Sequence, residues 1–331
     1  MINMGLLTFN TLDEMWHHAL LNVFTNGYAI GSRDGECSEL IGYQGVLLDP
    51  NNNFIMNPHR GLDPVYAAAE LLWYLSGERD IKRVVAYAPQ YARFANDGMA
   101  HGAYGWRWSN DNAYHDAAAM IGVSPTSQLD TAARLLKDKR ATRQAVVTMW
   151  NAGDLVCATH SPKNDLPCTL SMQFILREGK LHMIVTMRSN DLWLGLPYDV
   201  WSFTCIQRIV ADAVGVALGT YTHQVGSLHL YKRNAEKAKD VVGSMLPKLR
   251  ASHGWTSTGT YKLTDALAAE AAVRETRVDG MDLIDRITGF TDRTMMDDIV
   301  NLCVIKHAAI DIDRVCSPLL REAWRRKHAR P

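Results

Sequence analysis

The stretch DLPCTLSMQFILREGKLHMIVTMRSNDLWLGLPYD, residues 165–199, decides the fold class of this chain. Two apolar runs, Leu170 to Arg177 and Leu181 to Arg188, flank a Glu178-Gly179-Lys180 turn, and this pattern predicts a β-hairpin. Cys168 stands directly after a proline where the first strand begins, and the second strand leads into a loop punctuated by glycine and proline that carries Arg188 and Asp191. Antiparallel pairing therefore predicts that Arg188 returns to the neighbourhood of Cys168.

Further helices and strands are predicted on both sides of this hairpin. Asp63-Pro64 and Gly77 bound a predicted helix that contains Glu70, and Pro197 opens a second predicted helix that ends at a glycine, Gly219. Residues 145–150 predict a buried strand, and residues 221–231 predict another. Strands that alternate with helices and are joined partly by hairpins indicate an α/β (α+β) architecture, with a mixed or largely antiparallel sheet packed against helices.

The composition indicates a globular protein. The chain has 331 residues, of which 47% are hydrophobic, and the sequence shows no repeat, low-complexity tract or linker that would divide it. We therefore expect one domain over residues 1–331, in which residues 236–331 form helices and loops and the basic end AWRRKHARP is a solvated tail.

Charge and apolar runs limit the partners. Thirty-five basic and 35 acidic residues balance, so no bulk field draws the chain to nucleic acid or to an anionic membrane. We find no apolar run long enough to cross a bilayer and no leader-like N-terminus. The six scattered cysteines do not form a secreted disulfide framework, so we expect free thiols in a soluble, cytoplasmic protein.

The reactive candidate among these thiols is Cys168. Its position alone also fits a buried, inert cysteine, but a neighbouring guanidinium stabilises a thiolate, which is the reactive form. A metal site built from Cys157, His160 and Cys168 is disfavoured because the spacing matches no paired zinc motif. Nucleotide-binding glycine motifs of the Rossmann and P-loop types, HExxH and GxSxG are all absent.

Six ordered blocks carry a resemblance to a known family. They are SRDG at residues 32–35, ELLWYLSG at 70–77, AYGWRW at 103–108, TRQAVVTMWN at 142–151, the stretch quoted above and HQVGSLHLY at 223–231. Arg188 follows Cys168 by 20 positions and His229 follows it by 61, as in the family. The region from about residue 30 to 235 thus resembles the thymidylate synthase family, and this resemblance implies its fold, a homodimer formed through the sheet, and 5,10-methylenetetrahydrofolate as cofactor.

The resemblance also implies roles for single residues. Cys168 is the nucleophile that adds to carbon 6 of a pyrimidine, and Glu70 and Tyr104 serve water organisation and proton transfer. The phosphate ligands of the nucleotide are Arg33, Arg143, Arg188 and Ser189. Gln173 is near the nucleophile, and His229 and Tyr231 hold the sugar 3′-hydroxyl. Arg143 is expected to reach the partner's phosphate site, although Gln144 stands where the family has a second arginine. The cofactor residues are Asp191, Tyr91 and Gly195.

Asp199 departs from the thymidylate synthase pattern, which has asparagine at this position. Cytosine offers an amino donor at carbon 4 and an acceptor at N3, and a carboxyl group can accept from the first and share a proton with the second. An ionised carboxylate would repel the O4 of uracil. Aspartate at this position resembles the deoxycytidylate hydroxymethylase branch, so we expect Asp199 to bind and to help activate dCMP.

The one-carbon product depends on whether water is admitted. Tyr91 and Phe94 stand where methylating relatives have tryptophans, and the family's apolar C-terminal lid is missing at residues 329–331. We therefore expect hydroxymethylation of dCMP, with methylation of dCMP or hydroxymethylation of CMP as alternatives. Two further classes stay open, a non-catalytic protein that binds nucleotide or RNA, and a cysteine hydrolase that uses Cys168 with His160 or His223 as base.

Overall fold

The computed structural model describes residues 7–32, 34–124, 126–160, 165–247, 253–255, 257–258, 263–276, 294–307 and 311–328. The chain forms two compact units, each assembled from three separate stretches. The sheet unit comprises Met1–Leu62, Ala132–Val147 and Cys168–Ala251, and the helical unit comprises Asp63–Thr131, Thr148–Pro167 and Ser252–Pro331. Each unit is described by itself.

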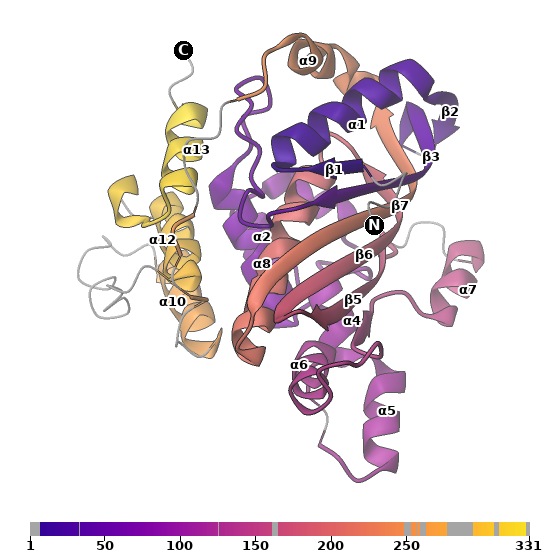
Figure 1. The fold of residues 1–331 in the computed structure, drawn as a ribbon, viewed down its shortest axis with the longest axis vertical. Helices are drawn as coiled ribbons and strands as arrows, with labels where there is room; N and C mark the ends of the chain where they lie inside the picture. The colour runs from indigo at the N-terminus through magenta and orange to yellow at the C-terminus, as the bar shows by residue number, and fades with distance from the viewer. Residues whose placement is uncertain are drawn as a thin grey trace. The chain divides into compact units, whose positions relative to one another are not determined.

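A mixed sheet is the centre of the sheet unit, which confirms the predicted architecture (Figure 1). Within the described residues it has seven strands, in the order β1-β3-β7-β6-β5-β4 with β2 paired to β3. The strands are β1 (Leu7–Phe9), β2 (Tyr28–Ser32), β3 (Gly35–Leu47), β4 (Val146–Thr148), β5 (Thr169–Arg177), β6 (Lys180–Asp191) and β7 (Ala217–Tyr231). Strand β6 is antiparallel to β5 and parallel to β7, while β3 is antiparallel to β7.

The predicted hairpin is confirmed as β5 and β6. Its turn residues Glu178 and Gly179 both have left-handed backbone conformations, with φ of 50° and 72°, as a two-residue hairpin turn of this hand requires. The second strand was predicted to end at Arg188 and runs further than we expected, because Ser189, Asn190 and Asp191 belong to β6 rather than to a loop. Continued pairing with β7 up to Asp191 and His229 holds this end of β6 in extended form.

The strand predicted over residues 145–150 is shorter than expected. Only Val146–Thr148 is extended, and Val146 and Thr148 are exposed while Val147 is buried. This alternation is that of a strand at the edge of the sheet with one face uncovered, and not that of a strand buried on both faces.

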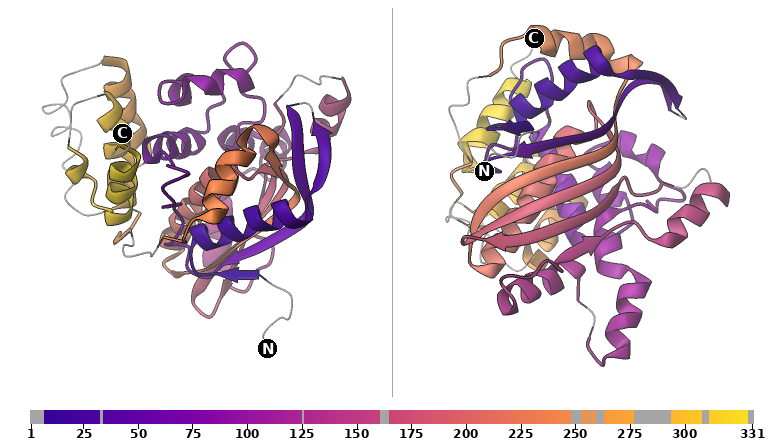
Figure 2. Two further views of the ribbon diagram at one scale, coloured as in Figure 1. Left: turned by 90° about the horizontal axis from the view of Figure 1, so that it is seen from above. Right: turned by 45° about the vertical axis from the view of Figure 1, so that its right-hand side comes forward.

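Within the described residues, three helices belong wholly to the sheet unit: α1 (Leu12–Asn26), α8 (Leu196–Val214) and α9 (Lys232–Gly243). Helix α8 packs on β6 and β7, where Gln207 bonds the carbonyls of Leu181 and Thr220, and α9 runs beside α1 (Figure 2). The helix opened by Pro197 ends earlier than predicted, since Gly215 terminates it with a left-handed φ of 75°. Residues 217–219, which we assigned to that helix, instead begin β7.

The helical unit contains α2 (Pro64–Ser76), α3 (Lys82–Val85), η1 (Pro89–Phe94), α4 (Tyr104–Asn110), α5 (Asn112–Met120), α7 (Ala152–His160), α10 (Leu263–Thr276), α12 (Met295–His307), η2 (Ile312–Arg314) and α13 (Pro318–His328). Helix α6 (Gln128–Asp138) begins in the helical unit and ends in the sheet unit. Helix α2 matches its prediction, because Asp63 caps it and Gly77 ends it.

Up to residue 328, the basic C-terminal end is helical and only partly the solvated tail that we expected. It is the last part of α13, in which Arg325, Arg326 and His328 are exposed, while Ala323 is buried and Lys327 pairs with Asp63, the residue that caps α2. The predicted absence of a lid concerns residues 329–331, which lie outside the described residues. Among the helices that the structure describes, none is both long and apolar enough to cross a membrane.

Candidate active site

Most of the predicted site residues meet at one end of the sheet. Because β5 is antiparallel to β6 and β7 is parallel to it, the start of β5 lies beside the ends of β6 and β7. Cys168 stands immediately before β5, Asp191 ends β6, and Asp191 pairs in register with His229. Strand β3 brings its first residues to the same end, where Cys37 pairs with Tyr231.

Cys168 and Arg188 are in direct contact, as the hairpin predicted. The Arg188 amide donates to the Cys168 carbonyl at 2.8 Å, and the Arg188 guanidinium Nη2 lies 3.6 Å from Cys168 Sγ. The thiol is half-buried and the guanidinium is exposed. A cationic donor at this distance stabilises a thiolate relative to a thiol, so the sulfur is placed for nucleophilic attack.

Ser189, His229 and Tyr231 form a polar group next to this pair. Ser189 Oγ lies 3.5 Å from His229 Nδ1, and the rings of His229 and Tyr231 meet edge to face at 5.0 Å. Burial raises the pKa of Tyr231 above its ordinary value, so the hydroxyl keeps its proton at neutral pH. These side chains offer hydroxyl and imidazole groups to a ligand at the sheet end.

Asp191 is fixed by the turn that follows it. Its Oδ1 accepts from the backbone amides of Trp193 at 2.7 Å and Leu194 at 3.2 Å. The carboxyl group is thereby oriented before any ligand arrives, and it is half-buried. Such an acidic group suits a heterocycle that presents N–H donors.

Asp199 lies in the first turn of α8 and is buried, with 8% of its surface exposed. Its Oδ2 accepts from Asn190 Nδ2 at 2.7 Å. The preceding helix start leaves little room beside this contact, since a Cβ on Gly195 would lie 2.8 Å from Asn190 Nδ2 and 3.2 Å from Asp199 Oδ2. Gly195 therefore makes the close approach of the two side chains possible.

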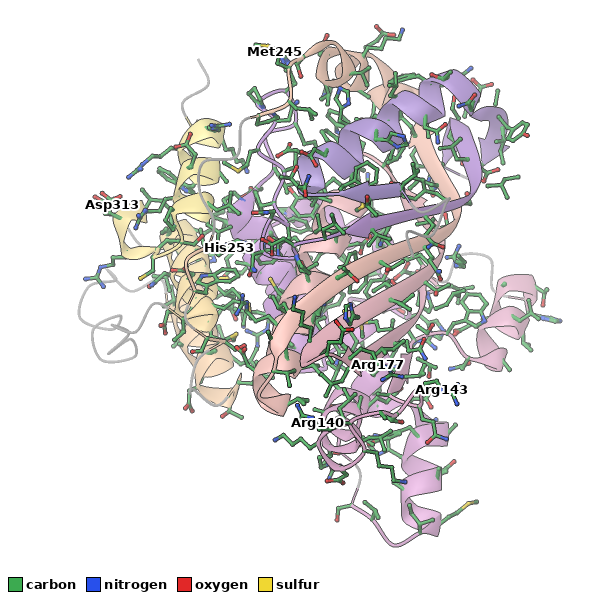
Figure 3. All side chains as sticks on the ribbon, viewed as in Figure 1. Arg140, Arg143, Arg177, Met245, His253 and Asp313 are labelled. Atoms are coloured by element: carbon green, nitrogen blue, oxygen red, sulfur yellow. The ribbon has the colours of Figure 1, made fainter. Side chains whose placement is uncertain are left out.

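Gln173 and Arg143 are neighbours on the β4–β5 side of the sheet. Gln173 Nε2 donates to the Arg143 carbonyl at 2.9 Å, and the Arg143 side chain is exposed (Figure 3). This exposure leaves Arg143 able to contact a second molecule. Arg33, the remaining predicted phosphate ligand, lies outside the described residues.

Glu70 belongs to the helical unit, on α2, and only 6% of it is exposed. Tyr66 donates to its Oε1 at 2.6 Å, and Tyr74, one turn further along, is a second hydrogen-bond partner. Burial raises the pKa of Glu70 from 4.5 to about 7, and the two tyrosines only partly oppose this effect. A carboxyl group with this pKa can give and take a proton at neutral pH.

Tyr104 and Tyr91 lie in an aromatic row on the same unit. Tyr104 contacts Tyr74 at 5.2 Å between ring centroids, Tyr74 contacts Trp73 at 5.7 Å, and Trp73 contacts Tyr91 at 5.3 Å. Tyr91 in turn meets Phe94 edge to face at 5.4 Å. The row follows the helix that carries Glu70, so the structure groups the three predicted residues of this unit around α2.

Comparisons with known proteins identify the family of the chain. A family model described as thymidylate synthase matches residues 14–265, which contain every site residue discussed above. The chain belongs to the thymidylate synthase family. This membership confirms the family resemblance on which the site residues were selected, while their individual roles stay predictions.

Similar proteins include two phage enzymes named deoxyuridylate hydroxymethyltransferase. That of Pseudomonas phage M6 is 32% identical over 196 residues, or 58% of this chain and 51% of the relative. That of Bacillus phage SP01 is 30% identical over 223 residues, or 66% and 56%. A thymidylate synthase of Bacillus phage phi3T is 30% identical over 143 residues, or 43% and 47%. The chain thus spans about half the length of the curated relatives it matches.

The cysteine hydrolase alternative is disfavoured because His223, one of its two candidate bases, is not available to accept a proton. Both ring nitrogens of His223 are engaged, Nδ1 with Tyr221 and Nε2 with Asn190, and burial lowers the pKa of His223 to about 3. His160 bonds its neighbour Thr159 in α7. All six cysteines are free thiols, and no group of three His, Cys, Asp or Glu residues within the described ranges is arranged to hold a metal ion.

Asn190 is the site residue that sequence reasoning missed. It stands between Ser189 and Asp191, both of which were selected, but an asparagine at the end of a strand has no distinctive spacing. Its hydrogen bond to Asp199 joins residues on a strand and a helix, and so became visible only in the folded structure.

Proposed function

We propose that the protein transfers a one-carbon unit from 5,10-methylenetetrahydrofolate to carbon 5 of dCMP and adds water, giving 5-hydroxymethyl-dCMP. The observation that carries this proposal is the buried carboxyl group of Asp199, which accepts a hydrogen bond from Asn190. Asn190 is on β6, the same strand as Arg188, which contacts Cys168. Family members use methylenetetrahydrofolate as their one-carbon donor, so the cofactor follows from membership.

Cys168 begins the reaction. Its thiolate, stabilised by Arg188, forms a bond from sulfur to carbon 6 of the base. The C5=C6 electron pair moves into a C4=C5 bond, and the former C4=N3 pair takes a proton at N3. Carbon 5 of the resulting enamine is a nucleophile, which the unmodified aromatic ring is not.

Asp199 supplies the proton at N3 in this proposal. Its carboxyl group accepts from the 4-amino group and shares a proton with N3, which neutralises the charge that develops as the thiolate adds. A uracil ring presents an oxygen at carbon 4, and this oxygen would face an acceptor in a buried site. Unpaired contacts of this kind are the basis for the expected preference for dCMP.

Phosphate and sugar are assigned to the polar group at the sheet end. Arg188 and Ser189 bind the phosphate, together with Arg33 and with Arg143 from a second copy of the chain, since planar guanidinium groups suit phosphate oxygens. His229 and Tyr231 hold the sugar 3′-hydroxyl, and Gln173 binds near the base. The deoxynucleotide is preferred over CMP in this assignment.

The cofactor is assigned to residues that fit a heterocycle with N–H donors and a flat ring. The preoriented carboxyl group of Asp191 suits the donors, and Tyr91 offers an aromatic edge. Gly195, which directly precedes α8, is assigned to the cofactor because the family resemblance implies it. Glu70, with its pKa near 7, organises water and moves protons, assisted by Tyr104.

Hydration rather than methylation is supported by two observations. Phe94 is 41% exposed and Tyr91 is half-buried, so these rings form a less continuous cover than a pair of tryptophans would. The two phage relatives described above are named hydroxymethyltransferases. Methylation of dCMP to 5-methyl-dCMP is the second candidate, and we propose that the enzyme acts as a cytoplasmic homodimer.

Product analysis tests the proposal. The protein is incubated with dCMP, CMP or dUMP and with methylenetetrahydrofolate labelled in its methylene group, and the nucleotides are separated and weighed by mass spectrometry. We expect labelled 5-hydroxymethyl-dCMP from dCMP, at a higher kcat/KM than from either other nucleotide, and no product with Cys168→Ser. Recovery of 5-methyl-dCMP with dihydrofolate would refute hydration, and preferred turnover of dUMP would refute the substrate.

A cheaper measurement separates the enzyme from a binding protein. Addition of the Cys168 thiolate to carbon 6 makes carbon 5 able to take up a proton from solvent and then to release its original hydrogen. An active enzyme therefore exchanges this hydrogen with solvent even without the one-carbon donor. We expect tritium release from [5-³H]dCMP. Binding without exchange would favour the non-catalytic alternative.

A further inference from the structure

Four buried side chains form a hydrogen-bonded series that ends at Asp199. Tyr221 OH lies 2.8 Å from His223 Nδ1, His223 Nε2 lies 3.0 Å from Asn190 Oδ1, and Asn190 Nδ2 lies 2.7 Å from Asp199 Oδ2. Tyr221 and His223 are fully buried, while Asn190 and Asp199 are 3% and 8% exposed. All four belong to the sheet unit.

The direction of each hydrogen bond follows from the chemistry of its ends. A carboxylate oxygen only accepts, so the Asn190 amide nitrogen faces Asp199 and the Asn190 carbonyl faces His223. That carbonyl also only accepts, so the proton of a neutral His223 is on Nε2. Nδ1 is then an acceptor, and the Tyr221 hydroxyl donates to it.

Burial holds Tyr221 and His223 in the protonation states that these hydrogen bonds require. The pKa of His223 falls to about 3, and that of Tyr221 rises because the site is desolvated and because Asp199 is near. The imidazole is therefore neutral and the phenol keeps its proton at any pH at which the protein would work. Every donor consequently points toward the carboxyl group, and each polarises the next.

We propose that Asn190, His223 and Tyr221 are positioning residues that fix Asp199 for reading the amino base. By engaging Oδ2 as an acceptor, Asn190 sets the rotation of the carboxyl plane and favours Oδ1 as the oxygen that carries the proton shared with N3. The inference rests on the proposed function and deepens it, because it assigns base selectivity to three residues that do not touch the nucleotide.

The backbone at Gly195 also supports this assignment. The Cβ of any other residue at this position would lie 2.8 Å from Asn190 Nδ2 and 3.2 Å from Asp199 Oδ2, so the contact requires glycine at the helix start. Packing of the end of β6 against α8 could be achieved with apolar side chains. The close contact between the Asn190 amide and the Asp199 carboxyl group beside Gly195 therefore points to a role beyond packing.

The test compares base selectivity with stability. Asn190→Leu removes the amide but keeps the same branched arrangement of side-chain heavy atoms, and its matched control is Asn53→Leu, which removes a buried hydrogen bond of 2.7 Å to Thr204 on the same helix α8. For each variant, kcat and KM are measured for dCMP and dUMP, and Tm is measured in parallel. We expect Asn190→Leu to lower kcat/KM for dCMP by about 10- to 100-fold, the effect of losing a hydrogen bond to a charged group.

The ratio of kcat/KM for dCMP over dUMP is the deciding quantity. We expect it to fall about tenfold or more with Asn190→Leu and to stay within about twofold of the starting value with Asn53→Leu, although both variants lose stability. His223→Gln, which keeps a donor toward Asn190, should retain more of the ratio than His223→Phe. Tyr221→Phe, which deletes one hydroxyl group, should give a smaller change in the same direction and serves if Asn190→Leu does not fold.

Each outcome separates this inference from the proposed function. An unmodified protein that does not prefer dCMP would refute the proposed substrate and the inference with it, before any variant is made. An unmodified protein that prefers dCMP, with a ratio that Asn190→Leu and Tyr221→Phe leave unchanged, would overturn only the inference. An equal fall of the ratio with Asn53→Leu would also overturn it, since any loosening of α8 would then have the same effect.

Discussion

The carboxyl group of Asp199 and the carboxamide of an asparagine have nearly the same size, and they differ in what they offer to a base. A carboxyl group accepts at one oxygen and can share a proton at the other, while a carboxamide has a permanent donor. Because only 8% of the Asp199 surface is exposed, water cannot replace a missing hydrogen-bond partner of the base. At the residue scale, one atom at position 199 is therefore expected to select between cytosine and uracil.

Exchange of this atom gives the sharpest residue-scale prediction. We expect Asp199→Asn to lower kcat/KM for dCMP by about 100-fold or more and to raise it for dUMP, because the amide donates to O4 and accepts from N3–H. Competition between the two nucleotides in one reaction measures the ratio directly. A variant that still favours dCMP would show that the amino base is selected elsewhere.

At the element scale, helix α2 places an acid among apolar and aromatic side chains. Glu70 is one turn from Tyr66 on one side and from Tyr74 on the other, and both hydroxyl groups bond it. Helical spacing thus supplies both hydrogen-bond partners from the same element, and the burial of the helix supplies the raised pKa. Neither effect depends on a second charged residue.

The pH dependence of stability checks this arrangement. The folded-state pKa of Glu70, about 7, is above the ordinary value of 4.5, so the native protein binds the proton more tightly than the unfolded chain does. Stability should therefore fall as pH rises from about 4.5 to about 7, by up to roughly 3 kcal/mol. We expect Glu70→Gln to remove this part of the pH profile in thermal unfolding, and an unchanged profile would contradict the raised pKa.

At the scale of the whole molecule, the sheet face opposite α8 is the surface that we expect to bury in a homodimer. Thr186, Gln224 and Gln44 stand on this face, are half-buried and are joined across three strands by hydrogen bonds of 3.2 and 3.1 Å. Arg143 is exposed at the β4 side of the same sheet. We expect a second copy seated on this face to bring its own Arg143 toward the phosphate-binding residues of its partner.

Mixed dimers test whether Arg143 acts in the partner's site. Arg143→Ala and Cys168→Ser are each inactive or weak alone, but a heterodimer of the two has one site with an intact Cys168 and an intact arginine from the other subunit. We expect equal mixing to restore about a quarter of the unmodified activity per chain. If Arg143 serves its own subunit, mixing restores nothing.

The sequence was sufficient wherever a local pattern has one structural solution. A Glu178-Gly179-Lys180 turn between two apolar runs specified the hairpin, although Lys180 proved to be the first residue of β6, and antiparallel pairing then placed Arg188 beside Cys168. Proline and glycine fixed the ends of α2 in the same way. Local signals were less reliable where pairing with another strand prolonged or shortened an element, as at Asp191 in β6 and at Ala217 in β7.

Only the tertiary structure showed which polar side chains share a buried space. Asn190, His223 and Tyr221 have ordinary surroundings in the sequence, and they form a series because β6 and β7 run in parallel against the first turn of α8. Hydrogen bonds between distant segments depend on the angles and separations of packed elements, which no local pattern encodes. The sequence by itself determined the pairing of Arg188 with Cys168 and the family, and the fold decided how the acid at position 199 is held.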